Sequence, residues 1–282
     1  MSAASEGEMT LDTTVTLNDG NEIPILGFGT FQIDDGPECE QAVLHALEVG
    51  YRHIDTAHVY GNEASVGRAI SDSDVPRNEL FVTTKTPFDL SPSNIRQVLG
   101  QSLEKLQTEY VDLYLIHWPM TDELAVPWET LVELRQEGKC RSIGVSNFTV
   151  RRFEEAFQPD ISTLPAVNQV ECHVFNQRPD IVEFCREKGI EIEAYSPLTR
   201  GQRMSHPVVT EIAASHGKAA PQVMIRWLLQ KGIVTIPKSS NPDHIRQNAD
   251  IFDFALSEEQ MRRLDELDEG LEVQDWHPKG FY

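Results

Sequence analysis

The sequence predicts an α/β protein in which eight parallel strands alternate with helices and close into a (β/α)8 TIM barrel, with an N-terminal β-hairpin closing the barrel bottom. Eight short β-type runs alternate with amphipathic segments along the 282 residues, without a linker-like break. A doubly wound sheet would show the same alternation, but no GxGxxG follows the first strand, so the usual dinucleotide-binding signature is missing. We therefore expect one domain over residues 1–282, with residues 1–10 as a flexible tail.

The elements follow in order from local patterns. In residues 13–17, Val15 and Leu17 alternate with polar neighbours, and the turn signal Asp19-Gly20 separates this run from residues 22–26, which predicts the hairpin. The strand candidates are residues 25–31, 51–57, 80–86, 111–118, 142–148, 166–173, 190–198 and 233–239. Helical spacing lies between them, for instance over residues 93–107 behind the start signal Ser91-Pro92. Ser257 and Gln260 form a capping box ahead of the last predicted helix.

Composition and charge argue against several classes of protein. The 45 acidic and 24 basic residues give a net charge of −21, which repels nucleic-acid phosphates and anionic membranes. No apolar run approaches the ~20 residues that span a bilayer, and the N-terminus has no signal-peptide pattern. Four widely spaced cysteines without a metal-binding pattern indicate reduced structural thiols, no metal site and a cytoplasmic location. The acidic excess would suit a high-salt cytoplasm, where such repulsion is screened.

Four ionisable residues fall at the carboxyl ends of consecutive predicted strands, where barrels of this kind carry their chemistry. Asp55 ends one strand and Tyr60 follows it, Lys85 ends the next strand, and His117 ends the third. Each alone has a structural explanation: a turn-forming Asp, an aromatic rim residue, a surface Lys and a buried His. Lys85, however, follows an apolar strand and needs a partner there, which Asp55 on the adjacent strand would supply. Together the four residues favour a single site.

Such a site could protonate a carbonyl oxygen. A free phenol, with a pKa near ~10, is a poor acid at neutral pH, and an adjacent ammonium lowers that pKa. Asp55 would keep Lys85 charged, and Tyr60 would then give its proton as negative charge develops on the carbonyl oxygen. His117 would orient the carbonyl by a hydrogen bond. This is machinery for carbonyl reduction, and it requires a hydride donor.

Motifs along nearly the whole chain resemble those of the aldo-keto reductase family, in the family's order. They are IPILGFGTF, HIDTAHVYGNE, TTK, YLIHWP, GVSNF, NQVECH, YSPL and IPKS. The resemblance, which is to the short-loop prokaryotic type, implies an NAD(P)H-dependent oxidoreductase, a monomer that reduces small aldehydes and ketones to alcohols. It carries the family's catalytic roles onto Asp55, Tyr60, Lys85 and His117. A cofactor-binding, redox-sensing partner subunit is the alternative, but that role would tolerate erosion of a catalytic set that is intact here.

The resemblance also implies a site for NADP(H), with NAD(H) as a second cofactor. The residues that match the family's cofactor contacts are Thr30, Ser146, Asn147, Gln169, Tyr195, Ser196, Leu198, Lys238, Ser239, His244 and Asn248. Ser146, Asn147 and Gln169 match those that hydrogen-bond the nicotinamide carboxamide, and Tyr195 matches the ring that stacks on the nicotinamide. Ser196 and Leu198 fall in the segment that holds the pyrophosphate.

One part of this implied site departs from the family's pattern. Lys238 and Ser239 match the residues that contact the adenosine 2'-phosphate, and a lysine beside a helix start suits a phosphate. At the position of His244, relatives with a strong NADPH preference usually carry an arginine. Because histidine is largely neutral above pH ~6.5, we expect NADPH to be preferred over NADH by a small margin.

The implied substrate pocket is open and weakly selective. Phe31 and Trp118 match aromatic positions at its mouth, and Trp276 near the C-terminus would close over it. The predicted loops after YLIHWP and after YSPL are short, which leaves little chain to enclose a large substrate.

Overall fold

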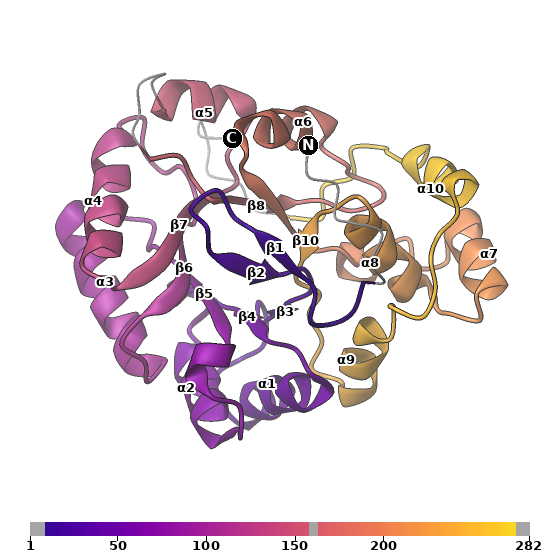
Figure 1. Cartoon of the computed structure of the whole chain (residues 1–282), viewed down its shortest axis with the longest axis horizontal. Helices are drawn as coiled ribbons and strands as arrows, with labels where there is room; N and C mark the ends of the chain where they lie inside the picture. The colour runs from indigo at the N-terminus through magenta and orange to yellow at the C-terminus, as the bar shows by residue number, and fades with distance from the viewer. Residues whose placement is uncertain (1–8, 158–162, 275–282) are drawn as a thin grey trace.

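The computed structural model, which describes residues 9–157 and 163–274, has eight parallel strands arranged as a barrel (Figure 1). The strands are β3 (Phe28–Gly29), β4 (His53–Asp55), β5 (Phe81–Lys85), β6 (Val111–Ile116), β7 (Cys140–Ser146), β8 (Val167–Glu171), β9 (Glu191–Tyr195) and β10 (Val234–Thr235). Each pairs with its neighbour in chain order. A parallel bridge between Leu26 and Thr235 joins the first and last strand segments, so the predicted (β/α)8 barrel is confirmed.

All eight predicted strands are present, although several are shorter than their sequence patterns. The run 233–239, for example, keeps only the two residues of β10. The strand ends before Pro237, which has no N–H to give to the ladder. The first strand is also short, but backbone hydrogen bonds continue beside it: the Gly27 N–H donates to the Thr235 carbonyl at 2.9 Å and the Gly29 N–H to the Pro237 carbonyl at 3.1 Å.

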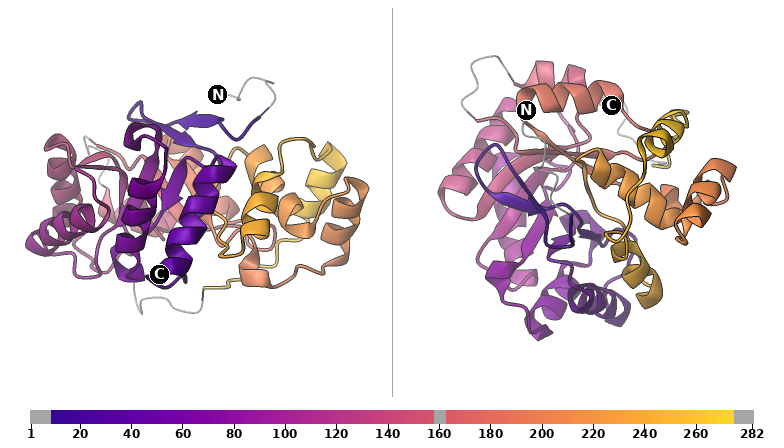
Figure 2. Two further views of the ribbon diagram at one scale, coloured as in Figure 1. Left: turned by 90° about the horizontal axis from the view of Figure 1, so that it is seen from below. Right: turned by 45° about the vertical axis from the view of Figure 1, so that its right-hand side comes forward.

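The predicted hairpin, β1 (Thr14–Thr16) and β2 (Glu22–Pro24), is antiparallel and lies across one end of the barrel (Figure 2). Leu17 and Ile23 are buried with apolar side chains near the amino ends of the strands, including Phe81 and Val167. The Asn18 side chain also donates a hydrogen bond of 2.8 Å to the Pro165 carbonyl, two residues before β8. The hairpin therefore covers the barrel bottom and leaves the carboxyl ends of the strands for a site.

Helices surround the barrel (Figure 1). They are α1 (Pro37–Val49), α2 (Glu63–Asp72), α3 (Pro92–Lys105), α4 (Ala125–Gln136), α5 (Val150–Ala156), α6 (Pro179–Lys188), α7 (Pro207–Ser215), α8 (Ala220–Gln230), α9 (Pro242–Ala249) and α10 (Glu258–Asp265). Several begin with proline at or next to the first helical position, where the missing N–H has no intrahelical acceptor. The predicted helix behind Ser91-Pro92 is α3, and the Ser257–Gln260 capping box is present at the start of α10.

The interior of the protein has an apolar layer and a polar layer. Between strands and helices it is apolar, whereas inside the barrel the wall carries buried polar side chains from β4, β5, β8 and β9. All four cysteines are free and buried, and burial raises the pKa of each thiol to about 12. No helix in the described part of the chain is long and apolar enough to cross a membrane. Residues 1–8 of the predicted tail lie outside the described residues.

Candidate active site

A cavity of about 730 Å³ lies at the carboxyl ends of the strands, and it contains the predicted catalytic residues. Asp55 is the last residue of β4, Lys85 the last of β5, and His117 the first residue after β6. Tyr60 stands in the single 3₁₀ turn His58–Tyr60 that follows β4. Asp55, Tyr60 and His117 line the cavity, and Lys85 is fully buried beneath it. The structure therefore brings the four residues together.

Lys85 lies between the carboxylate and the phenol. Its Nζ donates to Asp55 Oδ1 at 2.8 Å, to Asp55 Oδ2 at 2.7 Å and to the Thr56 carbonyl at 2.9 Å. The fourth partner is Tyr60 Oη at 3.2 Å. These contacts aim the ammonium at the phenol oxygen, and they supply the partner that a buried amine needs.

The electrostatics of Tyr60 differ from the sequence-based expectation. Burial raises the pKa of the phenol, and although the Lys85 charge lowers it, the net result is a pKa of about 12. The Lys85 charge acts in the predicted direction, but desolvation of the phenol outweighs it, so the net lowering that was predicted is wrong. Burial also opposes the charged form of Lys85, but Asp55 and Tyr60 outweigh it and raise the pKa of the amine. Lys85 consequently remains a cation.

His117 faces the same cavity as a neutral ring. Burial, with a smaller contribution from the Lys85 charge, holds the pKa of His117 well below its usual value. Its ring packs edge-on against the Tyr60 ring at 5.6 Å between centroids. Nδ1 is buried and makes no hydrogen bond within residues 9–157 and 163–274. A neutral imidazole in this position can hydrogen-bond a ligand without acting as a strong acid.

Next to these residues, the ends of β7 and β8 form a connected set of amides and hydroxyls. The Asn147 side chain donates to the His117 carbonyl and to Ser146 Oγ, both at 3.0 Å, and accepts from Tyr195 Oη at 2.8 Å. Ser146 Oγ donates to the main-chain carbonyl of Gln169 at 2.8 Å. Asn147 itself adopts the left-handed backbone conformation, with φ of 64°, which asparagine tolerates better than most residues.

Most predicted cofactor residues line the cavity, and three do not. Those in the lining are Ser146, Asn147, Gln169, Tyr195, Ser196, Leu198, Lys238 and His244. Of the others, Thr30 is buried and donates to the Asp55 carbonyl at 3.0 Å, and Asn248 is buried in α9. Ser239 Oγ accepts from the Asn241 N–H at 3.1 Å. The donor set nevertheless fits a nicotinamide nucleotide, since amides, an aromatic ring and a lysine line the same cavity.

Sequence reasoning missed part of the lining. Phe88, Val59, Met204, Arg200 and Gln274 contribute to the cavity beside the predicted Phe31 and Trp118. Phe88 follows β5 and could have been found by the same strand-end rule. Arg200, whose guanidinium lies 5.5 Å from the Phe31 ring, could not, because it comes from the irregular segment after β9. Trp276, predicted to close over the pocket, lies outside the described residues.

That segment after β9 carries a cluster of non-glycine residues with positive φ. Ser196, Thr199, Arg200 and Arg203 have φ values between 48° and 63°. Each such residue adds backbone strain, and strain of this kind gathers at ligand-binding segments. The segment borders the cavity, which Ser196 and Arg200 line.

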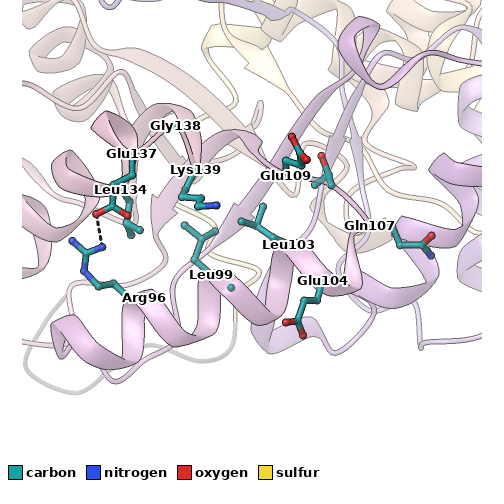
Figure 3. A pocket seen from close by; sticks show the side chains of 12 residues that line it. Arg96, Leu99, Leu103, Glu104, Gln107, Glu109, Leu134, Glu137, Gly138 and Lys139 are labelled. Carbon is teal, nitrogen blue, oxygen red and sulfur yellow. Dashed lines mark hydrogen bonds and ion pairs between the residues drawn. The ribbon is translucent and has the colours of Figure 1, made fainter.

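A second hollow, of about 890 Å³, lies between α3 and α4 on the outside of the barrel (Figure 3). Its lining includes Arg96, Glu104, Glu137 and Lys139. Arg96 donates to Glu137 at 2.7 Å, so this ion pair satisfies part of the hollow's own charge. None of the predicted catalytic or cofactor residues lies there. The cavity at the strand ends is therefore the candidate active site.

Comparisons with known proteins agree on the kind of molecule this is. The aldo/keto reductase family model matches residues 25–269. Glyoxal reductase of Bacillus subtilis is 45% identical over 258 residues, which are 91% of this chain and 93% of that protein. An aldo-keto reductase of Mycolicibacterium vanbaalenii is 49% identical over 260 residues, 91% of this chain and 92% of that protein. The crystal structure of MGS-M4, an aldo-keto reductase enzyme from a Medee basin deep-sea metagenome library, matches with a TM-score of 0.88 at 42% identity, covering 92% and 96% of the two chains.

Proposed function

The chain belongs to the aldo/keto reductase family and is an NAD(P)H-dependent reductase of carbonyl compounds, and we propose that Tyr60 is its proton donor. The observation that carries the proposal is the contact of 3.2 Å between Lys85 Nζ and Tyr60 Oη, with the same ammonium held by both oxygens of Asp55. This arrangement places a fixed positive charge at the oxygen that would lose a proton.

The proton transfer follows from these contacts. With a pKa of about 12, the Tyr60 phenol is protonated before the reaction begins. It is a weak acid, but the alkoxide that develops from a carbonyl is a far stronger base than a phenolate, so transfer from Oη is downhill once negative charge accumulates. Lys85 then stabilises the phenolate that remains, because it cannot move away from its three other acceptors.

The remaining components are the hydride and the orientation of the substrate. A bound nicotinamide would supply the hydride, and Ser146, Asn147 and Gln169 would hold its carboxamide. His117 is neutral and edge-on to Tyr60, so it would hydrogen-bond the carbonyl oxygen and keep it within reach of Oη. The four residues Asp55, Tyr60, Lys85 and His117 are thus proposed as the catalytic set.

For the cofactor we propose NADP(H), with NAD(H) accepted as well. Lys238 is exposed at the cavity and free to meet a 2'-phosphate, whereas Arg246 on the following helix is paired with Asp243 at 3.3 Å. The first N–H groups of α9 already donate to Asn241 Oδ1, at 2.8 Å and 3.2 Å. Phosphate recognition therefore rests largely on one lysine, which supports a small margin between the two cofactors.

The proposed substrates are small aldehydes and ketones. Phe31, Val59, Phe88 and Trp118 give the cavity an apolar side next to Tyr60, which suits short carbonyl compounds without a matched charge. A relative that is 45% identical is a glyoxal reductase, so short dicarbonyls belong in the first screen. We also propose a single-domain cytoplasmic monomer, supported by buried free cysteines, and adaptation to high salt, supported by the net charge of −21.

The experiment is a steady-state screen in which oxidation of NADPH and NADH is followed with glyoxal, a short ketone and an aromatic aldehyde. We expect turnover with the aldehydes and a lower KM for NADPH than for NADH. Absence of turnover with every carbonyl, although NADPH binds, would instead support a cofactor-binding subunit without catalysis.

A further inference from the structure

Glu193 is a buried carboxyl beside the proposed site, and neither the chemistry above nor the resemblance gives it a role. It lies on β9 directly opposite Gln169 of β8 in the strand register. Its side chain is completely buried, and its Oε2 accepts a hydrogen bond of 2.9 Å from Gln169 Nε2. The other oxygen, Oε1, is 3.4 Å from His53 Nε2.

The surroundings of Glu193 favour its neutral form. Burial, reinforced by the negative charge of Asp55 and to a smaller extent of Glu191, raises its pKa to about 8, against the opposing effects of Gln169 and Lys85. His53, which faces Glu193 Oε1, has its own pKa lowered to about 3, first by burial and then by the Lys85 charge. The contact between Glu193 and His53 is therefore not an ion pair at neutral pH.

Gln169 connects Glu193 to the catalytic residues. Its Nε2 donates to Asp55 Oδ2 at 2.8 Å as well as to Glu193 Oε2 at 2.9 Å, so both amide protons are used. An ionised Asp55 can only accept, which requires the NH2 end of the amide to face it. The carbonyl oxygen of the amide must then point the other way. Among the described residues this oxygen accepts no hydrogen bond, and Gln169 lines the cavity.

Two anchors restrain the amide more than one would. With the Asp55 contact alone, the amide group could turn about that hydrogen bond and carry its carbonyl oxygen away from the cavity. The second contact, to Glu193, fixes the plane of the group. The side-chain oxygen of Gln169, held in this way, can accept a hydrogen bond, and the NH2 group of a nicotinamide carboxamide can donate one.

We propose that Glu193 is a positioning residue for the cofactor: it holds the Gln169 side-chain amide so that its oxygen, Gln169 Oε1, accepts a hydrogen bond from the carboxamide NH2 of the nicotinamide. This rests on the proposed function, in which Gln169 meets the carboxamide. Glu193 itself touches neither cofactor nor substrate.

The test compares two nucleotides, NADP⁺ and its 3-acetylpyridine analogue, in which a methyl ketone replaces the carboxamide and removes its N–H donors. Their dissociation constants are measured by isothermal titration calorimetry, which does not depend on turnover. For wild type we expect NADP⁺ to bind about 3- to 10-fold more tightly than the analogue, the usual effect of one net hydrogen bond.

Three variants separate positioning from packing. The quantity compared is the ratio of the dissociation constant of the analogue to that of NADP⁺. Glu193→Gln keeps an acceptor for Gln169 and should retain the wild-type ratio to within about 2-fold. Glu193→Met keeps the volume but removes the acceptor, so the ratio should fall close to one, with NADP⁺ losing affinity and the analogue largely unchanged. Glu191→Met is the matched control, since Glu191 lies two residues earlier on β9 and makes no hydrogen bond to Gln169; it should keep the ratio.

Each outcome is decisive. If Glu193→Met keeps the wild-type ratio, or weakens both nucleotides equally, Glu193 only fills the barrel and the proposal is wrong. A wild-type ratio of one would also overturn it, because Gln169 would then accept nothing from the carboxamide. Should Glu193→Met fail to fold, Glu193→Ala removes the same acceptor and carries the same expectation. Wild type that binds neither nucleotide would overturn the proposed function first, and this inference with it.

Discussion

Replacing Lys85 by methionine removes the cation that touches both Asp55 and Tyr60. Methionine keeps most of the volume of the lysine stem, but it cannot make the four hydrogen bonds of Nζ, which range from 2.7 to 3.2 Å. Asp55 would remain buried without its counter-charge. Breaking a buried pair in this way destabilises a protein by ~3–5 kcal/mol, and that is the loss we expect in the free energy of unfolding near neutral pH.

This loss should depend on pH. Burial already raises the pKa of Asp55, and Lys85, which opposes the rise, is gone in the variant. The folded variant therefore holds a proton on Asp55 that the unfolded chain releases above pH ~3.9. Since the folded state binds more protons in that window, stability falls as pH rises through it, up to the folded-state pKa. The variant should thus lie further below wild type at about pH 8 than at about pH 5.5.

The assays are urea unfolding at both pH values and NADPH oxidation with a small aldehyde. Turnover should fall sharply in the variant, because the Tyr60 phenolate loses its stabilising charge, while cofactor binding is retained. Lys139→Met is the control: Lys139 is an exposed lysine on the outside of the barrel, so its loss should change stability by at most ~1 kcal/mol and leave turnover intact. If Lys85→Met resembled this control in both assays, Lys85 would not hold the site together.

Three further predictions concern pH, cofactor choice and salt. The Glu193 carboxyl has a pKa of about 8 in the folded chain, well above its unfolded value, so it contributes a loss of stability as pH rises towards 8; Glu193→Gln should flatten that slope in unfolding measurements, and an unchanged slope would contradict the assignment. His244→Arg should tighten NADPH by ~1 kcal/mol or more, with little effect on NADH, and equal effects on the two KM values would show that His244 does not face the phosphate. With a net charge of −21, the melting temperature should rise as KCl approaches molar concentration, and a melting temperature indifferent to salt would exclude adaptation to a saline cytoplasm.

The parts of this molecule that the sequence predicted are those set by local patterns. Strand and helix periodicities gave the barrel, and the rule that chemistry follows strand ends selected Asp55, Lys85 and His117. The pKa of Tyr60 depends instead on the balance between desolvation of the phenol and the Lys85 charge, which no local pattern reveals. Its direction was accordingly predicted wrongly.

Contacts between strands were also beyond the sequence. Gln169 and Glu193 are 24 residues apart and meet only because β8 and β9 pair in one particular register. Thr30 and Asn248, predicted by resemblance to contact the cofactor, are buried and do not line the cavity. Arg200 has a left-handed backbone conformation, which the sequence does not predict because residues other than glycine rarely adopt it.

The central claim is that Tyr60 gives the proton, and Tyr60→Phe tests it most directly. The substitution keeps the ring that packs at 4.9 Å on Phe31 and removes only the hydroxyl at 3.2 Å from Lys85. The dissociation constant for NADPH, measured by titration, should stay at its wild-type value, while kcat for aldehyde reduction falls by at least the ~100-fold typical of general acid catalysis. Wild-type turnover in Tyr60→Phe, with NADPH bound as tightly as before, would contradict the account, because the proton would then come from another group.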